Sequence, residues 1–261
     1  MKVLVTGATG FVGSRVVRRL LEERHDVRAV HRPSSSFSQV EDIRDRIDWV
    51  LGDVLEPDGL HRAFDDMECV VHAAAEIAFG RGEVERRLHR VNVEGTANLV
   101  NAALDHGRVR VIHVSSIAAL GRSPRQSEAA SARNGDRICT DESAEWVESD
   151  LNTAYARSKY LAEMEVRRGV AEGLDAVIVN PSVVMGVGRS GRNTTLLAER
   201  VRDGRIPLVP TGSTNVVDVL DVADGILKAL EKGRRGERYI LAGENLEWKE
   251  IITMLADAFD V

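Results

Sequence analysis

The chain opens with a glycine-rich stretch, Thr6-Gly7-Ala8-Thr9-Gly10-Phe11-Val12-Gly13, between an apolar β-branched run and a longer amphipathic run. The first run, residues 2–6, predicts a strand, and the second, residues 11–24, predicts a helix. Glycines at this spacing permit a tight turn with positive φ and let backbone N–H groups approach a pyrophosphate at the positive end of the helix. Because a strand precedes the turn and a helix follows it, we expect dinucleotide binding rather than a plain tight turn. The candidate pyrophosphate-site residues are Thr6, Gly7, Gly10, Phe11, Val12 and Gly13.

The end of the second predicted strand, residues 27–31, indicates which dinucleotide binds. An acidic residue at this point would bond a ribose 2′-hydroxyl, whereas a basic residue would accept a 2′-phosphate. The segment reads Val30-His31-Arg32-Pro33-Ser34 and holds no acid. We therefore expect NADP(H) to be preferred, with Arg32 clamping the phosphate through its guanidinium fork, and NAD(H) as the alternative. The competing interpretation is that Arg32 is a solvated cation at the end of a strand.

Short β-branched runs alternate with longer periodic stretches along the whole chain, as in strand–helix–strand units around a parallel sheet. This pattern predicts an α/β fold with a doubly wound, Rossmann-like parallel sheet of six or seven strands. The predicted strands are residues 2–6, 27–31, 47–51, 69–72, 109–114 and 176–179, and the predicted helices include residues 11–24, 57–64, 83–105, 152–172 and 246–259. We expect residues 1–180 to form a dinucleotide-binding domain that also carries the catalytic residues. Residues 181–261 should contribute a small C-terminal substrate lobe and return to the core.

Composition narrows the class of protein. The chain has 35 basic and 41 acidic side chains in 261 residues, a formal net charge of −6, which argues against a nucleic-acid binder. No apolar run is long enough to span a bilayer, and the first residues lack the order of a signal peptide, so we expect a cytoplasmic protein without membrane association. Cys69 and Cys139 have no second sulfur or histidine at metal-ligand spacing, so no metal site is expected. Two loops, residues 121–150 and 185–193, are expected to open beside the site, the first as a functional lid.

Tyr155 and Lys159 lie one turn apart near the start of the helix predicted at residues 152–172, so they project from one face. A lysine cation close to a tyrosine favours the phenolate, and we expect it to lower the phenol pKa toward the working range of an acid–base catalyst. Such a pair alone is common on exposed helices. Ser115 and Ser116 strengthen the case because they end a predicted strand at the carboxyl edge of the sheet, where doubly wound folds bind ligands.

Taken together, these features resemble the extended short-chain dehydrogenases/reductases, and within them the dihydroflavonol-4-reductase-like branch of the epimerase/dehydratase group. The matching segments run along nearly the whole chain: Gly7 to Gly13, Gly52-Asp53-Val54, His72-Ala73-Ala74-Ala75, Val91-Asn92-Val93-Glu94-Gly95-Thr96, Ser115-Ser116, Tyr155 with Lys159, Asn180-Pro181-Ser182 and Val217-Asp218-Val219.

The resemblance implies a role for each matching residue. Asp53 and Val54 would meet the adenine, Ala73, Ala74 and Ala75 would line the adenosine and ribose, and Pro181, Ser182 and Val183 would face the nicotinamide. Ser116 would polarise the substrate oxygen, Tyr155 would act as acid–base and Lys159 as its electrostatic partner, while Asn92 would order the site. Lys159 can also hold the nicotinamide ribose hydroxyls, so Tyr155 and Lys159 count as cofactor-contact candidates as well. Ser115 competes with Ser116 for the polarising role and also counts as a cofactor-contact candidate. Asp53 could instead be a turn residue, and Asn92 an amide on a helix surface.

These features predict an NADP(H)-dependent reductase or dehydrogenase that acts on a small carbonyl or alcohol substrate. The alternative is a nucleotide-sugar epimerase or dehydratase with tightly bound NAD(P). Such enzymes carry polar contacts to the sugar diphosphate where this chain has Ala118, Val183 and the uncharged Ser213-Thr214-Asn215, which favours the reductase. A third interpretation is a non-catalytic NADP-binding sensor, although such proteins commonly lose the tyrosine or the lysine.

Two departures from the family pattern affect the substrate lobe. Leu220 stands where relatives often have arginine. Relatives also usually continue for several dozen residues beyond the helix predicted at residues 246–259, whereas this sequence ends at Val261, so we expect a shortened chain or an unusually open, incomplete substrate pocket. The resemblance also suggests a homodimer through the helices at residues 83–105 and 152–172.

Overall fold

The computed structural model describes residues 1–122, 140–189 and 193–261. Cys139 and most of the loop predicted at residues 121–150 lie outside the described residues, as do residues 190–192 of the loop predicted at residues 185–193. The expected lid role of the first loop therefore stays a prediction.

A seven-stranded sheet forms the centre of the molecule, and every neighbouring pair of its strands runs parallel. The strand order is β3-β2-β1-β4-β5-β6-β9, which confirms the predicted doubly wound sheet. In chain order the strands are β1 (Lys2–Thr6), β2 (Asp26–His31), β3 (Asp48–Leu51), β4 (Cys69–His72), β5 (Arg110–Val114), β6 (Asp175–Pro181) and β9 (Arg238–Leu241).

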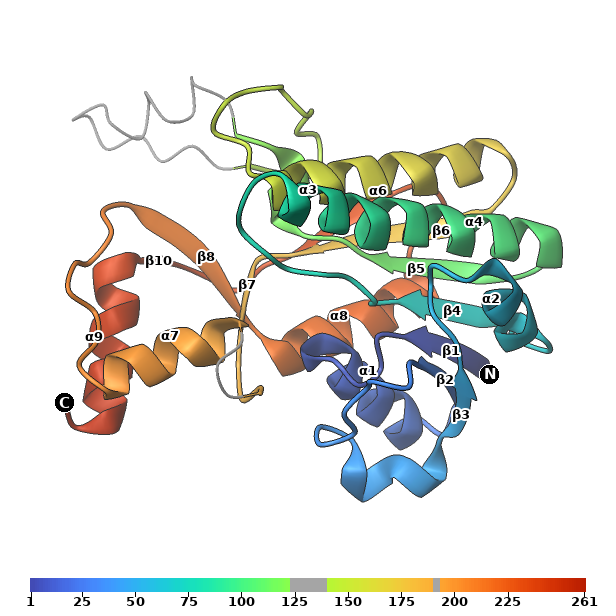
Figure 1. Cartoon of the computed structure of the whole chain (residues 1–261), viewed down its shortest axis with the longest axis horizontal. Helices are drawn as coiled ribbons and strands as arrows, with labels where there is room; N and C mark the ends of the chain where they lie inside the picture. Colours follow the sequence, from blue (N-terminus) through green and yellow to red (C-terminus); the bar gives the residue numbers. More distant parts are fainter. Residues whose placement is uncertain (123–139, 190–192) are drawn as a thin grey trace.

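Helices cover both faces of this sheet (Figure 1). On one face α1 (Phe11–Glu22) and α8 (Val219–Lys232) pack side by side and bury Val16, Leu20 and Ile226 against the strands. On the other face α2 (Pro57–Phe64), α4 (Gly95–His106) and α6 (Ala154–Ala171) bury a second core that includes Leu60, Leu99 and Val166. Since apolar residues of the central strands, such as β1, β4 and β6, alternate between the two cores, this part of the sheet is buried on both faces.

A smaller mixed sheet lies beside the large one and is built by the C-terminal part of the chain (Figure 1). Its strands are β7 (Val183–Met185), β8 (Ser213–Asp218) and β10 (Glu244–Glu247), accompanied by α7 (Asn193–Arg202) and α9 (Trp248–Phe259). The chain returns to the large sheet through α8 and β9. The domain boundary expected at residue 180 stays a prediction. β9 comes from residues 181–261 but pairs with β6 of the first 180 residues in the large sheet.

Two local features differ from the sequence expectation. The helix predicted at residues 83–105 is α3 (Glu83–Leu88), a π-helical turn η2 (His89–Glu94) and α4, and π-turns inside helices often accompany functional sites. The helix predicted at residues 246–259 begins at Trp248, because the preceding residues pair with β8 as β10. Two short 3₁₀ segments, η1 (Glu41–Arg46) and η3 (Ile117–Leu120), complete the described elements.

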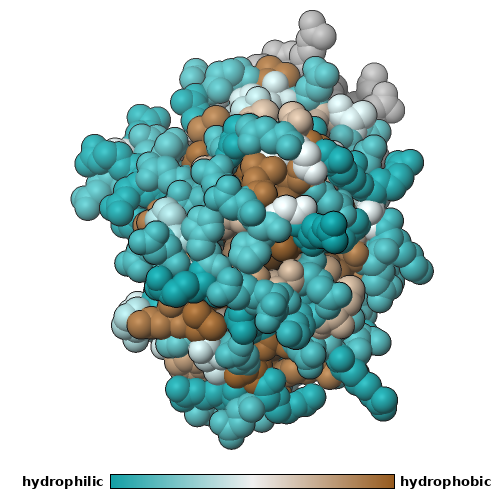
Figure 2. All heavy atoms as spheres, turned by 90° about the vertical axis from the view of Figure 1, so that its right-hand side faces the viewer, coloured by the Kyte–Doolittle hydropathy of each residue, from teal (hydrophilic) through white to brown (hydrophobic). Residues whose placement is uncertain are grey.

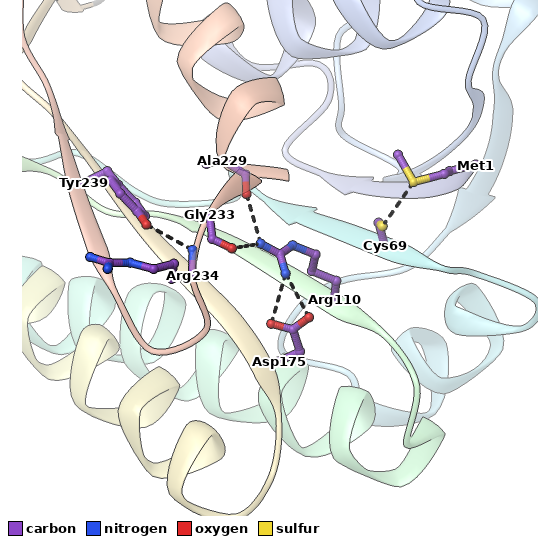
Figure 3. A network of polar contacts seen from close by, with 8 residues as sticks. All are labelled: Met1, Cys69, Arg110, Asp175, Ala229, Gly233, Arg234 and Tyr239. Atoms are coloured by element: carbon purple, nitrogen blue, oxygen red, sulfur yellow. Dashed lines mark hydrogen bonds and ion pairs between the residues drawn. The ribbon is translucent and has the colours of Figure 1, made fainter. Parts of the chain in front are cut away.

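Arg110 ties the amino-terminal ends of the central strands to the end of α8 (Figure 3). Its Nη1 donates to Asp175 Oδ2 at 2.9 Å, and its Nη2 donates to the carbonyl oxygens of Ala229 and Gly233.

The side of the molecule that bears the N terminus, away from the small sheet, is covered mainly by hydrophilic side chains with smaller apolar areas between them (Figure 2). None of the helices in the described ranges is long and apolar enough to cross a bilayer.

Two histidines are buried next to each other on β4 and β5. The rings of His72 and His113 lie 5.3 Å apart, and burial lowers the pKa of His72 to about 3 and that of His113 well below its usual value. His72 bonds Thr6 Oγ1 at 2.7 Å, whereas neither ring nitrogen of His113 has a hydrogen-bond partner among the described residues. A buried polar group without a hydrogen-bond partner lowers the stability of a fold. A histidine that stays neutral when buried lowers it further in acid, because only the unfolded chain then binds a proton on the imidazole.

We predict that His113→Leu stabilises the protein progressively as the pH falls below 6.5. Below that pH the unfolded chain takes up a proton on the imidazole that the folded chain does not bind, so wild type loses about 1 kcal/mol per pH unit from this residue. Urea unfolding at pH 7.5 and pH 5 measures the difference. Ile112→Leu, at the neighbouring buried position of β5, changes no titratable group; it is the control and should leave the pH dependence unchanged. Equal pH dependence for wild type and His113→Leu would contradict the prediction.

Candidate functional site

The glycine-rich turn forms a cradle that side chains could not enter. Gly7 has φ +74°, and a Cβ placed there would lie 2.6 Å from the backbone nitrogen of Ala74. A Cβ on Gly13 would overlap the carbonyl oxygen of Gly7. Gly10 precedes α1 with no side-chain cap and no acid in the first turn, so the amino end of the helix offers its N–H groups and partial positive charge.

The next strand end closes the other side of this cradle. Thr6 Oγ1 bonds His72 Nδ1 and accepts a hydrogen bond from the backbone nitrogen of Ala74 at 3.3 Å. Ala73 and Ala74 are partly exposed and Ala75 is exposed, as residues that line a ligand groove must be. The turn and the strand end together fit the diphosphate of a dinucleotide, because the backbones approach closely and leave small side chains at the surface.

The end of β2 presents Arg32 to solvent. Its backbone nitrogen donates to Ser35 Oγ at 3.0 Å, while its guanidinium makes no ion pair or hydrogen bond with any of the described residues. Arg189, from the segment after β7, donates to the carbonyl oxygen of Ser36 at 2.9 Å and so adds a second cation to the same turn. Sequence reasoning missed Arg189, since it lies 153 positions from the residue it contacts.

Asp53 and Val54 follow β3 at the same edge. Asp53 Oδ1 accepts a hydrogen bond from the backbone nitrogen of Leu55 at 3.0 Å, so the carboxylate supports a turn, as the alternative interpretation held. Val54 is buried against Gly95 of α4. The adenine contacts expected for both residues stay predictions.

Ser116 and Tyr155 meet at the carboxyl end of β5. The Ser116 hydroxyl accepts a hydrogen bond from the Ala118 backbone nitrogen at 3.2 Å, and its side chain lies close enough to the Tyr155 phenol to lower the pKa of that phenol. Ser115 instead points into the interior and donates to Glu163 Oε1 at 2.5 Å. The geometry therefore favours Ser116 over Ser115 as the group that can reach a substrate oxygen.

The expectation that Lys159 lowers the pKa of the Tyr155 phenol is wrong. Burial raises the pKa of Tyr155, and only the hydrogen bond from Ser116 opposes it. The physical reason is the direction of the lysine: Lys159 is buried and its Nζ donates to the carbonyl oxygen of Val114 at 2.9 Å. Burial lowers the pKa of Lys159 to about 8, against an opposing effect of the Glu163 carboxylate.

Asn92 is buried in the π-turn η2, so the alternative of a surface amide is wrong. Its Oδ1 accepts from the backbone nitrogen of Glu76 at 2.8 Å, and its Nδ2 donates to the Glu76 carbonyl oxygen and to Ser158 Oγ at 3.0 and 2.9 Å. Asn92 thus fastens the segment after β4 to the helix that carries Tyr155 and Lys159. It touches neither of those two side chains through a hydrogen bond in the described part of the chain.

Pro181, Ser182 and Val183 link the end of β6 to the start of β7. The backbone nitrogen of Ser182 donates to Leu241 of β9 at 3.0 Å, and its buried Oγ has no partner among the described residues. A buried hydroxyl without a partner at this edge is suited to receive a polar ligand group.

Sequence reasoning gave no role to two buried polar residues, Asn180 and Glu163, or to the partly buried Arg238. Asn180 Nδ2 donates to the Ser116 carbonyl oxygen at 2.9 Å and to Glu163 Oε1 at 2.6 Å. Arg238 of β9 lies 3.4 Å from Glu163 Oε2. For Glu163 the sequence did contain one signal, its spacing. Glu163 stands one helical turn after Lys159, just as Lys159 stands one turn after Tyr155, which places all three on one face of the helix.

Residues 3–242 match the family model described as the NAD dependent epimerase/dehydratase family. The chain belongs to this family. The match covers most of the chain and includes the glycine cradle and the serine, tyrosine and lysine at the ends of β5 and α6. The resemblance stated from the sequence is thereby confirmed.

Curated relatives of this family member include several reductases. It is 37% identical over 258 residues to a dihydroflavonol 4-reductase-like protein of Synechocystis sp., covering 97% of this chain and 71% of the relative. It is 32% identical to cinnamoyl-CoA reductase 1 of Oryza sativa subsp. japonica, covering 98% of this chain and 75% of that protein. It is 30% identical to 2-alkyl-3-oxoalkanoate reductase of Stenotrophomonas maltophilia, covering 99% and 76%.

Two solved structures share the fold of this chain over nearly its whole length. The crystal structure of gox2253 matches with a TM-score of 0.87 at 36% identity, covering 99% of this chain and 75% of that one. DesIV, the dTDP-glucose 4,6-dehydratase of Streptomyces venezuelae, determined with NAD and TYD bound, matches with a TM-score of 0.86 at 26% identity, covering 100% and 82%. The protein is an NAD(P)-dependent oxidoreductase of the extended short-chain dehydrogenase/reductase type.

Proposed function

We propose that the protein is an NADP(H)-dependent reductase that interconverts a small carbonyl compound and its alcohol. The observation that carries the proposal is the contact between the Ser116 hydroxyl and the Tyr155 phenol, at the carboxyl edge of a sheet whose neighbouring strand ends form a dinucleotide cradle. A hydroxyl and a phenol that lie this close together can both reach a single substrate oxygen.

The chain's own residues fit the cofactor. Gly7, Gly10 and Gly13 leave space for the diphosphate, and Arg32 with Arg189 brings positive charge to the turn where a 2′-phosphate would lie. The reduced nicotinamide supplies the hydride when bound, beside the wall that we assign to Pro181, Ser182 and Val183.

The protein groups then handle the proton. Ser116 donates a hydrogen bond to the carbonyl oxygen and polarises it, while Tyr155 delivers its phenolic proton to the same oxygen. Burial favours the protonated form of Tyr155, which suits an acid in the direction of reduction. Lys159 would hold the ribose hydroxyls of the bound nicotinamide nucleotide, and Asn92 holds the helix in place through Ser158.

Apolar surroundings favour a weakly charged substrate over a nucleotide sugar. Phe79 is 76% exposed, and its ring centroid lies 6.4 Å from that of Tyr155. Ala118 and Val183 offer no polar side chain, and the Asn215 amide already bonds Asn245 at 2.8 Å within the small sheet. The names of the reductase relatives agree with this choice. The homodimer expected through residues 83–105 and 152–172, which hold α3, η2, α4 and α6, stays part of the proposal.

We predict that Arg32→Ala removes the preference for NADPH over NADH. A partly exposed charge-assisted hydrogen bond contributes on the order of 1.5 to 3 kcal/mol, or roughly tenfold or more in affinity. Fluorescence titration of both cofactors measures the two dissociation constants, with Arg62→Ala on the surface of α2 as the control. Equal affinities of the wild type for both cofactors, or an unchanged preference in Arg32→Ala, would refute the assignment.

Tyr155→Phe should keep cofactor binding and lose turnover by roughly 10²-fold or more, because the ring and its packing remain while the proton is removed. NADPH oxidation with a panel of ketones and aldehydes measures the rate. Tyr160→Phe, five positions along the same helix and stacked on Trp146, is the matched control and should retain activity. Near-normal turnover by Tyr155→Phe on any substrate that wild type reduces would contradict the role of Tyr155 as the proton donor.

A further inference from the structure

Glu163 of α6 is a carboxylate with no solvent exposure, placed behind the catalytic groups rather than among them. Its Oε1 accepts hydrogen bonds from Ser115 Oγ at 2.5 Å and from Asn180 Nδ2 at 2.6 Å, and its Oε2 lies 3.4 Å from an Arg238 guanidinium nitrogen. A buried charge persists only where hydrogen bonds and an opposite charge compensate for lost hydration, and here both are present.

The partners of Glu163 come from three different strands. Ser115 follows β5, Asn180 belongs to β6 and Arg238 begins β9, so one side chain fastens α6 to the ends of three neighbouring strands. Asn180 uses the same amide group to bond Ser116 at its carbonyl oxygen. The Glu163 carboxylate is therefore connected to the backbone of the residue that faces Tyr155.

We propose that Glu163 is a positioning residue whose buried carboxylate sets the place of Ser116 relative to Tyr155 and keeps Lys159 a cation. The inference rests on the proposed roles of Ser116, Tyr155 and Lys159. Tyr155, Lys159 and Glu163 follow one another at intervals of four residues on α6, so acid, cation and carboxylate form one line from the site into the interior.

The electrostatic part depends on the groups that face the lysine and the carboxylate. Glu163 on the same helix raises the pKa of Lys159, and Lys159 in turn helps to lower the pKa values of two buried histidines, His72 on β4 and His113 on β5. Because both imidazoles are neutral at ordinary pH, Glu163 is the charged group among these that favours the ammonium. Arg238 shares the carboxylate from β9. Removing the carboxylate alone should therefore make Lys159 lose its proton at lower pH.

Lysine is scarce in this chain, which allows a direct test. The five lysines are Lys2, Lys159, Lys228, Lys232 and Lys249. In protein labelled with ¹³C at the lysine ε-carbon, the Lys159 resonance is assigned as the one absent from Lys159→Met, and its titration needs neither substrate nor cofactor. We expect Glu163→Gln to move this titration downward by about one pH unit. The alkaline limb of NADPH-dependent ketone reduction should move in the same direction, while the NADPH dissociation constant measured near neutral pH changes little.

Matched variants separate the loss of the Glu163 charge from a general disturbance of the packing around α6. Glu165→Gln makes the same chemical change two residues along α6, in a partly exposed pair with Arg168, and should leave Lys159 unchanged. Arg238→Gln keeps the carboxylate, so its Lys159 titration should not move downward. If Glu163→Gln does not fold, the double variant Glu163→Gln/Arg238→Met removes the whole ion pair and should show the same downward shift.

An unchanged Lys159 titration in folded Glu163→Gln, or an equal downward shift in Arg238→Gln, would overturn the inference. Failure of the proposed function would look different: wild type would not oxidise NADPH with any carbonyl compound, whatever the Lys159 titration showed.

Discussion

The approach of two backbones at the first turn is the constraint on which the rest of the structure depends. Gly7 lies against Ala73 and Ala74 on one side and against Gly13 on the other, at distances that leave no space for a Cβ. This contact fixes where α1 starts relative to the ends of β1 and β4. The ends of the neighbouring parallel strands meet at the same edge, so the cradle also determines where a catalytic group must stand to reach a bound dinucleotide.

The catalytic side is organised by buried polar groups instead of by close backbone packing. Asn92 joins the segment after β4 to α6, and Glu163 joins α6 to β5, β6 and β9. Burying polar groups is costly unless each finds partners, and a network of this kind holds one arrangement of the site more firmly than apolar packing of similar area. The helix that carries Tyr155 is thus held at Ser158, between Tyr155 and Lys159, and at Glu163, one turn after Lys159.

Much of this could be predicted from the sequence because it depends on local pattern. The strands at residues 2–6 and 69–72 and the helix at residues 57–64 follow directly from hydrophobic periodicity and turn residues, and the order of family motifs located the candidate site. β9 was not predicted, since its four residues, Arg-Tyr-Ile-Leu, are all half-buried and carry no alternation. The π-turn at Asn92 was hidden inside a continuous helical pattern.

What the sequence did not reveal depends on side-chain direction across distant segments. Lys159 was expected to act on Tyr155, but its ammonium group is directed to the Val114 carbonyl oxygen. Glu163 received no interpretation from the sequence, and only the packing of β9 beside β6 shows that it is buried against Arg238. Arg189 reaches the turn after β2 from the far end of β7. Sequence spacing predicts neighbours on one element, whereas these contacts arise from tertiary structure.

The central claim is that this edge of the sheet passes a hydride from NADPH to a carbonyl carbon. Incubating the protein with NADPH deuterated at the transferring position of nicotinamide C4 and with a panel of ketones, aldehydes and nucleotide sugars, followed by mass spectrometry of the products, tests it most directly. The account predicts an alcohol that carries one deuterium on the former carbonyl carbon, formed in step with NADPH oxidation. Conversion of a nucleotide sugar without net oxidation of the cofactor, or cofactor binding with no labelled product from any compound, would contradict it.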